Sequence, residues 1–575
     1  MNVNEVWKPR PLVKNRTKSS VANLIKKYDY LAESVLSLDS LVMRRANLDV
    51  ITASDYKNLL LTAPSDKYKK ELDKAIAAIE PFIKDQRPIL VWGDYDVDGM
   101  TATASMVLTL SELDKNVSWF IPNRTLGYGL NVDKILEVFP EKGLIITVDT
   151  GIAEIEEIKK LKELGYTVVV TDHHLQQKEL PNADVLLDPK LYLKEDDTEY
   201  MVSGCFVGAQ VGLELIRKHL SDKFDYYKNV LSCFITLSIL SDMIELNKEI
   251  RVQLDYGLMC LNNAPHDGLT ALLVACGMRV EHEITSTFLS FTVNPKLNAA
   301  GRMDQVDKGM DILLCIHDDS YGKVTSRLYA NNIKALNNSR KIIEGQIYDQ
   351  ITDNIREDCP PAIIEYDADY PAGVVGIVAS RLVERYHVPT LILTGTDVIH
   401  GSGRTPDGID LFGALDQCKD LLLQFGGHRV AAGLALKPEN LDTFKKKFTE
   451  TVRQPGDIIN FTRYIDIDID IKNLYDIRFQ LFLWNFEPTG NKNEPINLLL
   501  SNVTVAALRV KGDITEVFIK DKIGFTTMLS KYKAIDYDQY LYKQVDILIN
   551  GMSMFYTGTL ITEWKIIAIK LANGV

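Results

Sequence analysis

The chain reads Ile89-Leu90-Val91-Trp92-Gly93-Asp94-Tyr95-Asp96-Val97-Asp98-Gly99 at the point that decides its fold. Four apolar residues lead directly into a turn that is bracketed by glycine and carries three carboxylates at alternate positions. A short apolar run bounded by turn residues is typical of a strand buried on both faces. Three acids this close repel one another unless a cation neutralises them. The stretch predicts a strand that ends at a metal site, with a calcium loop or a solvated acidic turn as the alternative. An EF-hand needs helical flanks, whereas an apolar strand leads in here.

Two further apolar runs end in the same way. Leu144-Ile145-Ile146-Thr147-Val148 is followed by Asp149, and Thr167-Val168-Val169-Val170 is followed, after Thr171, by Asp172-His173-His174. Amphipathic stretches separate the runs, which favours βαβ units and a parallel sheet. The carboxyl ends of parallel strands line one crevice. We therefore expect one cluster of seven side chains, which are Asp94, Asp96, Asp98, Asp149, Asp172, His173 and His174.

Mixed carboxylate and imidazole ligands favour Mn²⁺ or Mg²⁺ over structural zinc. A pocket of this kind can hold two divalent ions about 3.5–4 Å apart, which is the arrangement used in phosphoryl hydrolysis. We expect one carboxylate to bridge the ions, and Asp149 is our choice. Asp242 follows the apolar stretch Phe234 to Leu240 and is a further candidate ligand. Taken alone, Asp242 would be interpreted as a helix cap.

The rest of the chain divides by its periodicity. Residues 1 to about 85 look helical, through Val21–Ile25 and again through Leu72, Ile76, Ile79 and Ile83. Residues 205 to about 350 are also mostly helical in pattern, and a second α/β section begins near Pro361. From about residue 455 the period becomes two, with strict alternation in Ile465–Asp470, which predicts a small antiparallel barrel or sandwich. The predicted fold class is α/β with a β-rich C-terminal part.

Composition excludes several classes of protein. With 575 residues the chain is too long for one hydrophobic core. No window approaches 18 consecutive apolar residues, and the N-terminus lacks the layout of a signal peptide. The seven cysteines are scattered and never form a Cys-x-x-Cys pair, so we expect reduced thiols and a cytoplasmic location. The net charge of −13 disfavours a nonspecific DNA coat, but a basic groove can coexist with it because screening is short-ranged.

These motifs together resemble the DHH phosphoesterase superfamily and, within it, the RecJ single-strand-specific exonucleases. The acidic loop 94–98 matches the first motif, and Pro122-Asn123-Arg124 with Gly127-Tyr128-Gly129-Leu130 is similar to the second. Asp149 and Asp172-His173-His174 match the third and fourth, and Asp242 lies where the family has its last metal-binding Asp. Asn294 to Met303 resembles a RecJ-type signature.

The resemblance extends into the C-terminal half. Gly373 to Arg381, Gly401-Ser402-Gly403-Arg404 and Phe425-Gly426-Gly427-His428 match the DHH-associated domain, and the terminal β section is similar to the RecJ OB-fold. The implied domains are a helical segment (1–85) packing on the DHH domain, the DHH domain with a helical connector (86–350), the DHH-associated domain (351–455) and the OB-like domain (456–575).

The resemblance also implies roles for individual residues. It makes metal ligands of Asp94, Asp96, Asp98, Asp149, His173 and Asp242. It places Asp98, Asp172 and His174 in the chemistry, with His174 contacting or protonating near the scissile phosphate and Asp172 orienting the His pair. It makes phosphate-binding residues of Arg124, Arg302, Arg404, Gly426, Gly427 and His428.

Read without the family, the basic residues have competing interpretations. Arg302 follows Ala-Ala-Gly and could reach a phosphate bidentately, or it could pair with Asp304. Gly426-Gly427-His428 is either an anion-binding turn or a plain glycine turn. A basic helical stretch from Lys323 to Lys341, which includes Arg340, is either a solvated face or a track for a single-stranded backbone. Aromatic residues of the β section are either stacking platforms or core, with candidates at Phe518, Phe525, Tyr532, Tyr537 and Phe555.

The resemblance implies a divalent-metal exonuclease that degrades single-stranded DNA in the 5′→3′ direction to 5′-mononucleotides, in DNA repair or recombination. The implied cofactors are two divalent cations, Mn²⁺ or Mg²⁺, and the implied partners are single-stranded DNA and a single-strand binding protein. We expect a monomer without membrane attachment. The alternatives are a DHH enzyme acting on short oligoribonucleotides or cyclic dinucleotides, and a non-catalytic replication scaffold.

Overall fold

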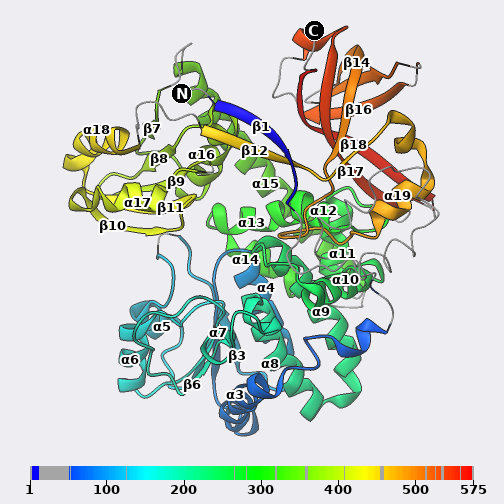
Figure 1. Ribbon diagram of the computed structural model, residues 1–575. Helices are drawn as coiled ribbons and strands as arrows, with labels where there is room; N and C mark the ends of the chain where they lie inside the picture. The colour runs from blue at the N-terminus through cyan, green and yellow to red at the C-terminus, as the bar shows by residue number, and fades with distance from the viewer. Residues whose placement is uncertain are drawn as a thin grey trace.

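The computed structural model describes residues 3–11, 51, 54–124, 126–264, 266–279, 282–316, 320–355, 360–406, 408–452, 459–511, 514–522, 524, 526–532, 537–556 and 559–572. Figure 1 shows an N-terminal α/β part in blue to green, a second α/β part in yellow, a β-barrel in orange and red, and a set of green helices between them. The predicted α/β class with a β-rich C-terminal part is confirmed.

The N-terminal part is built on a parallel sheet of five strands in the order β3-β2-β4-β5-β6. Its strands are β2 (Ile89–Trp92), β3 (Val117–Phe120), β4 (Leu144–Val148), β5 (Thr167–Thr171) and β6 (Val185–Leu187). All four neighbouring pairs are parallel, so every strand presents its carboxyl end at the same edge. The three apolar runs of the sequence are its central strands β2, β4 and β5, side by side.

Both faces of this sheet are covered, which explains the continuous apolar runs. Ile146 and Val148 of β4 pack into a core with α4 (Val97–Ser111), α8 (Gly204–His219) and α9 (Phe224–Ser241). Ile145, the neighbour of Ile146 in the same strand, packs into a second core with α5 (Val132–Val138) and α6 (Ile155–Glu163) on the other face. Helix α3 (Asp66–Lys84) joins the first core and confirms the helix predicted around Leu72 to Ile83.

A helical connector leads from this part to the second sheet. Its elements are α10 (Lys248–Asn262), α11 (Asp267–Ala275), α12 (Ser286–Phe288), a π-helical turn (Leu289–Val293), α13 (Asn294–Arg302), α14 (Val306–Leu313) and α15 (Ser320–Asn354). Helix α15 alone spans 35 residues. Within the described ranges, no helix combines the length and the apolar character needed to cross a bilayer.

The second α/β part has a five-stranded sheet in the order β10-β11-β9-β8-β7. Its strands are β7 (Ile363–Tyr366), β8 (Thr390–Thr394), β9 (Ile399–Arg404), β10 (Leu422–Gly427) and β11 (Ala431–Leu436). Only β7 and β8 run parallel. Its helices are α16 (Ala372–Tyr386), α17 (Leu411–Asp416) and α18 (Leu441–Val452).

The C-terminal strands close into a barrel. They are β14 (Leu498–Lys511), β15 (Ile514–Lys520), β16 (Thr526–Tyr532), β17 (Gln544–Tyr556) and β18 (Thr559–Leu571). The pairing runs β14-β15-β16-β18-β17 and returns from β17 to β14. The β16–β18 pairing is parallel, so the barrel is not wholly antiparallel as we predicted. A closed five-stranded barrel is the architecture of an OB-fold.

Two local predictions were wrong. Residues 1–85 were expected to be helical, but β1 (Val3–Pro9) is a strand paired in parallel with β12 (Ile459–Ile465). The backbone partner of β1 lies more than 400 residues away, so local periodicity could not reveal it. The alternation in Ile465–Asp470 does not form one strand, because Ile465 ends β12 and only Ile467–Asp468 form the next strand, β13. Between them, Asp466 is buried and accepts a hydrogen bond from Arg10. The predicted helix at Val21–Ile25 lies outside the described residues, and the domain boundaries stay predictions.

Candidate functional site

The acidic loop after β2 is folded back on itself by glycine. A Cβ on Gly99 would lie 2.4 Å from the backbone oxygen of Asp94, so a side chain there would force the loop open. Asp96 caps α4 by accepting a hydrogen bond from the Gly99 N–H at 3.0 Å. Asp94 and Asp98 are buried at 5% and 1% exposure. The alternative of a solvated acidic turn is therefore wrong.

Asp98 is held by groups from two other helices. Its carboxylate accepts from the backbone N–H groups of Gly204 and Cys205 at the start of α8, at 2.8 and 2.7 Å. The Ser238 hydroxyl of α9 donates to it at 2.7 Å. The start of α8 and three hydrogen bonds thus fix the orientation of the Asp98 carboxylate.

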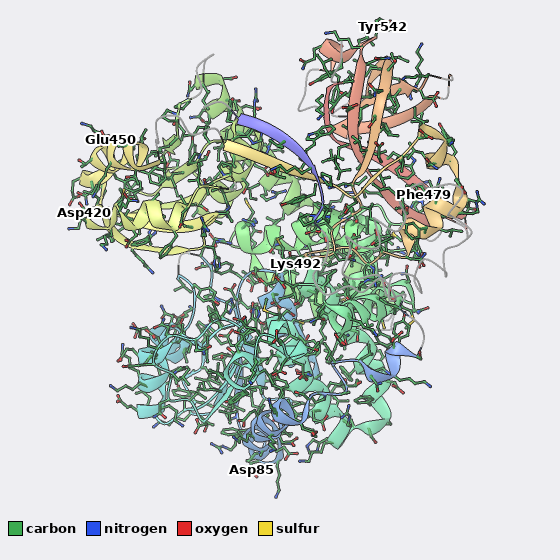
Figure 2. All side chains as sticks on the ribbon, in the orientation of Figure 1. Asp85, Asp420, Glu450, Phe479, Lys492 and Tyr542 are labelled. Carbon is green, nitrogen blue, oxygen red and sulfur yellow. The ribbon has the colours of Figure 1, made fainter. Side chains whose placement is uncertain are left out.

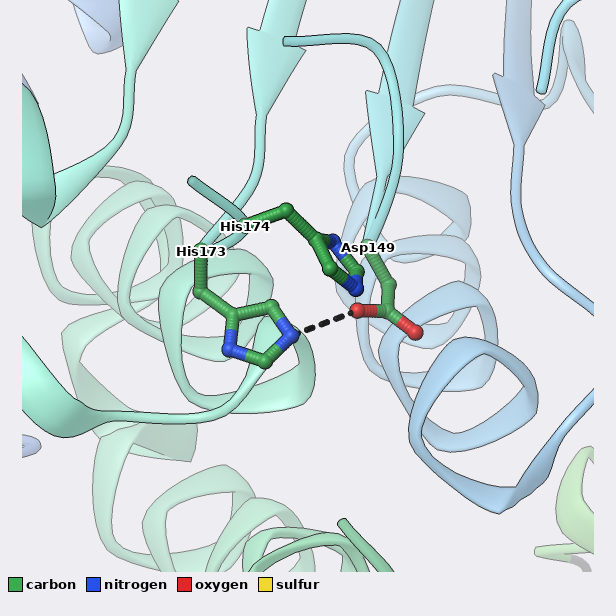
Figure 3. A group of neighbouring side chains, drawn as sticks. All are labelled: Asp149, His173 and His174. Carbon is green, nitrogen blue, oxygen red and sulfur yellow. Dashed lines mark ion pairs between the residues drawn. The ribbon is translucent and has the colours of Figure 1, made fainter. Parts of the chain in front are cut away.

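Asp149 and His173 face each other across the ends of β4 and β5. Asp149 has a left-handed φ of 58°, and its Oδ1 lies 3.0 Å from Nε2 of His173 (Figure 3). Nδ1 of His173 lies 2.9 Å from the Val202 carbonyl oxygen and donates to it. This bond directs the lone pair of Nε2 toward the carboxylates of Asp149, Asp98 and Asp242, the last two at 3.7 and 3.8 Å.

The cluster carries an excess of negative charge that the protein alone does not neutralise. Burial, together with the charge of Asp96, raises the pKa of Asp94 to about 8. Burial and the charge of Asp98 raise the pKa of Asp242 to about 8. The pKa of Asp149 is raised well above its usual range, first by burial and then by Asp98, Asp96 and Asp94. Burial lowers the pKa of His173 to about 4, so its ring is neutral and available as a ligand.

The side chains fit divalent cations. Three groups of ligand atoms, with the atoms of each group within 4.8 Å of one another, are Asp94 with Asp96 and Asp149, Asp98 with His173 and Asp242, and Asp149 with His173 and His174. Asp149 belongs to two of these groups and connects them. Oδ1 of Asp94 is buried and accepts no hydrogen bond in the described part of the chain, as expected for an oxygen that faces a cation. Asp242, which ends α9, turns its side chain toward His173 and is not only a helix cap.

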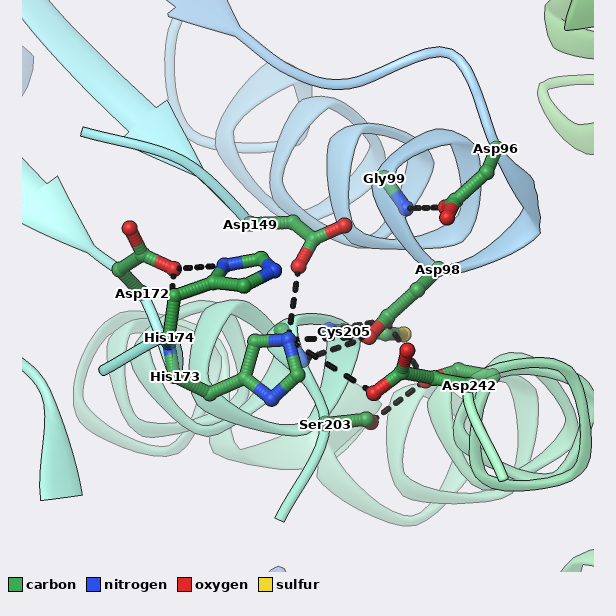
Figure 4. Close-up of polar contacts among 12 residues, drawn as sticks. Asp96, Asp98, Gly99, Asp149, Asp172, His173, His174, Ser203, Cys205 and Asp242 are labelled. Atoms are coloured by element: carbon green, nitrogen blue, oxygen red, sulfur yellow. Dashed lines mark hydrogen bonds and ion pairs between the residues drawn. The ribbon is translucent and has the colours of Figure 1, made fainter. Parts of the chain in front are cut away.

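Asp172 and His174 form a pair beside this cluster (Figure 4). The Asp172 carboxylate accepts from the N–H groups of Ile152 and His173, at 2.9 and 2.7 Å, and lies 2.8 Å from Nδ1 of His174. Burial would raise the pKa of Asp172, but the hydrogen bond and charge of His174 outweigh it and leave the pKa lowered. Burial would lower the pKa of His174, but Asp172 outweighs it and raises the pKa to about 9. His174 is therefore a cation at neutral pH in the metal-free protein, and 46% of its side chain is exposed.

A second cluster, of arginines, lies next to the acidic loop. The Arg124 guanidinium lies 4.2 Å from the ring centre of Tyr95, between Asp94 and Asp96 in the sequence. Burial lowers the pKa of Arg302 to about 10, and the nearby charges of Arg124, Arg340 and Arg404 act in the same direction. We call these four residues (Arg124, Arg302, Arg340 and Arg404) the arginine cluster. Like charges this close favour binding of an anion.

Arg302 is fixed by the approach of the second α/β part. A Cβ on Gly373 in α16 would lie 2.0 Å from the Arg302 backbone oxygen, so only glycine permits this contact. The Arg302 side chain donates to the Gly373 carbonyl at 3.1 Å. Asp304 instead accepts a hydrogen bond from the Arg124 backbone N–H at 3.0 Å. The alternative, an ion pair between Arg302 and Asp304, is not among the contacts of the described residues.

Other predicted phosphate-binding residues lie apart from these contacts. Gly426 and Gly427 end β10 and His428 follows them, all three exposed, with the His428 N–H donating to Ala431 across the hairpin. Among the described residues, no hydrogen bond or ion pair joins them to either cluster. The predicted basic track on α15 is interrupted, because Arg340 is buried and paired with Glu344 at 2.7 Å.

Of the barrel aromatics, Tyr537 is buried in the barrel core and offers no stacking platform. Phe518 lies beneath Arg509, whose guanidinium is 5.5 Å from its ring centre. Phe525 and the side chains of Tyr532 and Phe555 lie outside the described residues.

Sequence reasoning missed some residues of the site. Ser238 lies inside a helix, and nothing in its local sequence separates it from neighbouring polar residues. Arg340 was considered only as part of a basic helical stretch, and its approach to Arg302 was not predicted. Tyr128 was read only as part of a motif, but its hydroxyl donates to the Asp149 carbonyl at 3.3 Å and its ring meets His174 edge-on at 6.1 Å. Its position between two glycines was the available signal.

Comparisons with known proteins agree with these motifs. Residues 88–236 match the DHH family, N-terminal domain, and residues 360–454 match the DHHA1 domain. The chain is 33% identical over 410 residues to the single-stranded-DNA-specific exonuclease RecJ of Salmonella typhimurium, covering 67% of this chain and 69% of that protein. It is 31% identical over 476 residues to the protein of the same name from Bacillus subtilis, covering 80% of this chain and 58% of that longer relative.

Solved structures share the fold. A crystal structure of RecJ from Thermus thermophilus in complex with Mn²⁺ has a TM-score of 0.77 at 22% identity, covering all of this chain and 81% of that one. A crystal structure of exonuclease RecJ bound to manganese has a TM-score of 0.57 at 28% identity, covering 67% of this chain and 95% of that one.

Proposed function

The chain belongs to the RecJ family of single-stranded-DNA-specific exonucleases, and from this membership we propose that it hydrolyses single-stranded DNA with two divalent cations. The observation that carries the proposal is that Asp149 groups with Asp94 and Asp96 and also lies 3.0 Å from His173, which groups with Asp98 and Asp242. We propose Asp94, Asp96 and Asp149 for one ion, and Asp98, His173, Asp242 and Asp149 for the other. Mn²⁺ or Mg²⁺ suits these ligands. When bound, such ions supply an activated water and stabilise the leaving oxygen of a phosphodiester.

The chain's own residues would prepare the phosphodiester for attack. His174 is held by Asp172 with its other ring nitrogen directed away from that bond, and more of its side chain is exposed than that of His173. A protonated His174 would donate to an oxygen of the scissile phosphate or to the leaving group. Asp172 would hold the ring and stabilise its charge, which matches the lowered pKa of Asp172.

The arginine cluster would bind a phosphate of the strand. Arg302 and Arg404 come from different parts of the chain and are both partly desolvated, which strengthens a bidentate contact with a phosphate. Because Arg124 lies on Tyr95 of the acidic loop, a phosphate bound there is close to the metal ligands. We propose that this contact sets the position of the strand relative to the scissile bond, with Gly426, Gly427 and His428 as further phosphate contacts.

Polarity, product and setting follow from the family. We propose cleavage in the 5′→3′ direction with release of 5′-mononucleotides, in DNA repair or recombination. The domains we propose are 1–85, 86–350, 351–455 and 456–575, with the barrel as a single-strand platform. We further propose a cytoplasmic monomer that acts with a single-strand binding protein, in keeping with the free thiols of the six described cysteines.

A substrate comparison tests the proposal against the alternatives. Long single-stranded DNA, the matching duplex, a short oligoribonucleotide and a cyclic dinucleotide are incubated with the protein and Mn²⁺ in parallel. We expect turnover of the long single strand and little of the duplex. Turnover of the dinucleotide or oligoribonucleotide alone would favour the first alternative, and no hydrolysis of any substrate would favour the scaffold. The buried acidic cluster argues against a scaffold, because without cations it only destabilises the fold.

A further inference from the structure

We infer that Asn491, which lies far from the phosphoesterase part in sequence, is a positioning residue for the metal ligand Asp242. The inference rests on the proposed metal centre. It concerns a loop of the N-terminal part, Asp242 to Asn247, and a segment between α19 (Ile477–Trp484) and β14, which we call the buttress (residues 485–493). The buttress precedes the barrel in the sequence, yet it packs on the helical connector.

The loop that carries Asp242 is strained and only partly held by its own helix. Asp242 caps the C-terminal end of α9, and Met243 after it has a left-handed φ of 53°. That conformation is unfavourable for a residue other than glycine. The Met243 side chain is 67% exposed, so packing of that side chain does not hold it. The end of α9 holds the loop in part, because the Ile244 N–H donates to the Ile239 carbonyl at 3.0 Å, and further contacts come from the buttress.

Asn491 supplies that support through two hydrogen bonds. Its side-chain Nδ2 donates to the Met243 carbonyl oxygen at 2.6 Å. Its backbone oxygen accepts from the Leu246 N–H at 3.0 Å. The two bonds reach both sides of the loop, and Met243 is the residue next to the metal ligand. A rotation of the Met243 peptide would change the direction of the Asp242 side chain, whose Oδ2 lies 3.8 Å from Nε2 of His173.

The buttress is itself rigid, so its hold on the loop is firm. Arg251 of α10 donates to the backbone oxygens of Asn485 and Glu487. The buried Asn493 side chain donates to the Phe486 and Pro488 carbonyls at 2.8 and 3.0 Å. Ser286 of α12 donates to the Glu487 carboxylate at 3.1 Å. Figure 2 labels Lys492 in the middle of the molecule, beside the connector helices and away from Tyr542 on the barrel.

The consequence is that a segment near the C-terminal barrel helps to position a ligand of the metal centre in the N-terminal part. Asp242 is the most exposed of the proposed carboxylate ligands, with 35% of its side chain exposed against 4% for Asp149 and 2% for Asp98. The ligand least fixed by burial is therefore the one that depends on the buttress. Loss of the Asn491 side chain would weaken binding of the ion that Asp242 holds and leave the other ion largely unaffected.

The test is to measure Mn²⁺ binding to the full chain. Titration calorimetry gives the affinity and number of bound ions, and electron paramagnetic resonance gives the concentration of free Mn²⁺. Asn491→Ala removes the donor, and Asn491→Leu removes it while keeping a similar volume. We expect one of the two Mn²⁺ ions to bind about 3- to 10-fold more weakly in both variants. This loss is smaller than the loss expected when a residue that directly contacts a ligand side chain is removed. Hydrolysis should fall at limiting Mn²⁺ and recover at saturating Mn²⁺, with the KM for DNA unchanged.

Two control variants separate positioning from general damage. Asn497→Ala removes an asparagine of the same C-terminal section that also donates to a backbone carbonyl, that of Tyr464 at 2.9 Å. Lys472→Ala removes an exposed ion pair with Asp470 in the same C-terminal section, at 3.3 Å, outside both the loop and the buttress. Both should bind Mn²⁺ like the wild type. Equal Mn²⁺ binding by the wild type and both Asn491 variants would overturn the inference alone, whereas a wild-type chain that binds no Mn²⁺ would overturn the proposed function and the inference with it.

Discussion

The acidic cluster and the arginine cluster are neighbours of opposite charge, and the chain assembles them in different ways. The acids come from the ends of three strands of one sheet, together with Asp242. The arginines come from a loop, two connector helices and a strand of the second sheet. In both clusters like charges are gathered and partly buried, which raises the pKa of the acids and lowers that of Arg302. Each cluster is thus costly alone and is stabilised by a ligand of opposite charge, cations in one and a phosphate in the other.

The largest effect is expected from breaking the acidic cluster at the residue that connects its ligand groups. Asp149→Asn keeps the shape and removes the charge shared by both proposed ions. Since bound metal contributes several kcal/mol to the transition state, hydrolysis should fall by about 10³-fold or more. The measurement is the initial rate on single-stranded DNA with saturating Mn²⁺. Asp420→Asn, an exposed surface acid paired with Lys447, is the matched control and should retain wild-type activity.

A smaller loss is expected from breaking the arginine cluster. Arg302→Gln removes one charged partner of the proposed phosphate, and hydrogen bonds to charged groups are worth about 1.5–3 kcal/mol, or roughly 10- to 100-fold. The loss should appear mainly in KM, and Mn²⁺ affinity should stay close to that of the wild type. Arg429→Gln is the control, because the Arg429 side chain is 75% exposed. If Arg302→Gln instead abolished Mn²⁺ binding, the two clusters would not have the separate roles proposed here.

The pH dependence of metal binding sharpens the comparison further. The pKa values of Asp94 and Asp242, raised to about 8 in the metal-free fold, mean that the native state holds extra protons between the ordinary carboxyl range and pH 8. The stability contributed by those protons is complete below the unfolded pKa values and is lost as the pH rises through the folded ones. Because Mn²⁺ must displace these protons, its binding free energy should be more favourable at about pH 8 than at about pH 6, by roughly 1 kcal/mol or more. Mn²⁺ should therefore raise the melting temperature more at the higher pH. An equal shift at both pH values would count against proton–metal competition in the acidic cluster.

The smallest effect on activity is expected from a buried charge that already has its partner. Arg10 donates to Asp466 at 2.7 Å, and the Asp466 side chain is fully buried, so this pair needs no ligand. Arg10→Ala should lower the urea midpoint, and the free energy of unfolding by about 2–4 kcal/mol, because it removes the positive charge that faces a buried carboxylate. Hydrolysis at low urea should be close to that of the wild type.

The control for this variant is Arg478→Ala, which breaks an exposed pair with Asp476 and should cost less than about 1 kcal/mol. An unchanged urea midpoint for Arg10→Ala would show that the pair does not hold the N-terminal strand.

The same contrast explains how much could be predicted from the sequence. Asp94, Asp149 and Asp172 could be assigned to one crevice because each directly follows, or nearly follows, an apolar run, and parallel strands end at one edge. Asp242 needed the family resemblance, since its sequence context equally predicts a cap. The arginine cluster was foreseen only in part, because Arg340 lies in a long helix and its approach to Arg302 depends on the tertiary fold.

Where distant segments meet, local patterns gave no warning. The strand β1 pairs with β12, and Asn491 contacts the loop after α9, across 248 positions of sequence. In both cases the interaction is made largely by backbone groups, which leave no periodicity in the side chains. The interrupted alternation near Asp466 also depends on a distant residue, because its side-chain partner Arg10 lies 456 positions earlier in the chain.

The most direct test of the account is a time course on single-stranded DNA labelled at its 5′ or its 3′ end, with Mn²⁺, with Mg²⁺ and with EDTA. We predict that the 5′ label appears at once as a mononucleotide, while the 3′ label passes through progressively shorter strands, and that EDTA stops both. Release of the 3′ label first, internal cuts, or hydrolysis that persists in EDTA would contradict a metal-dependent exonuclease acting from the 5′ end.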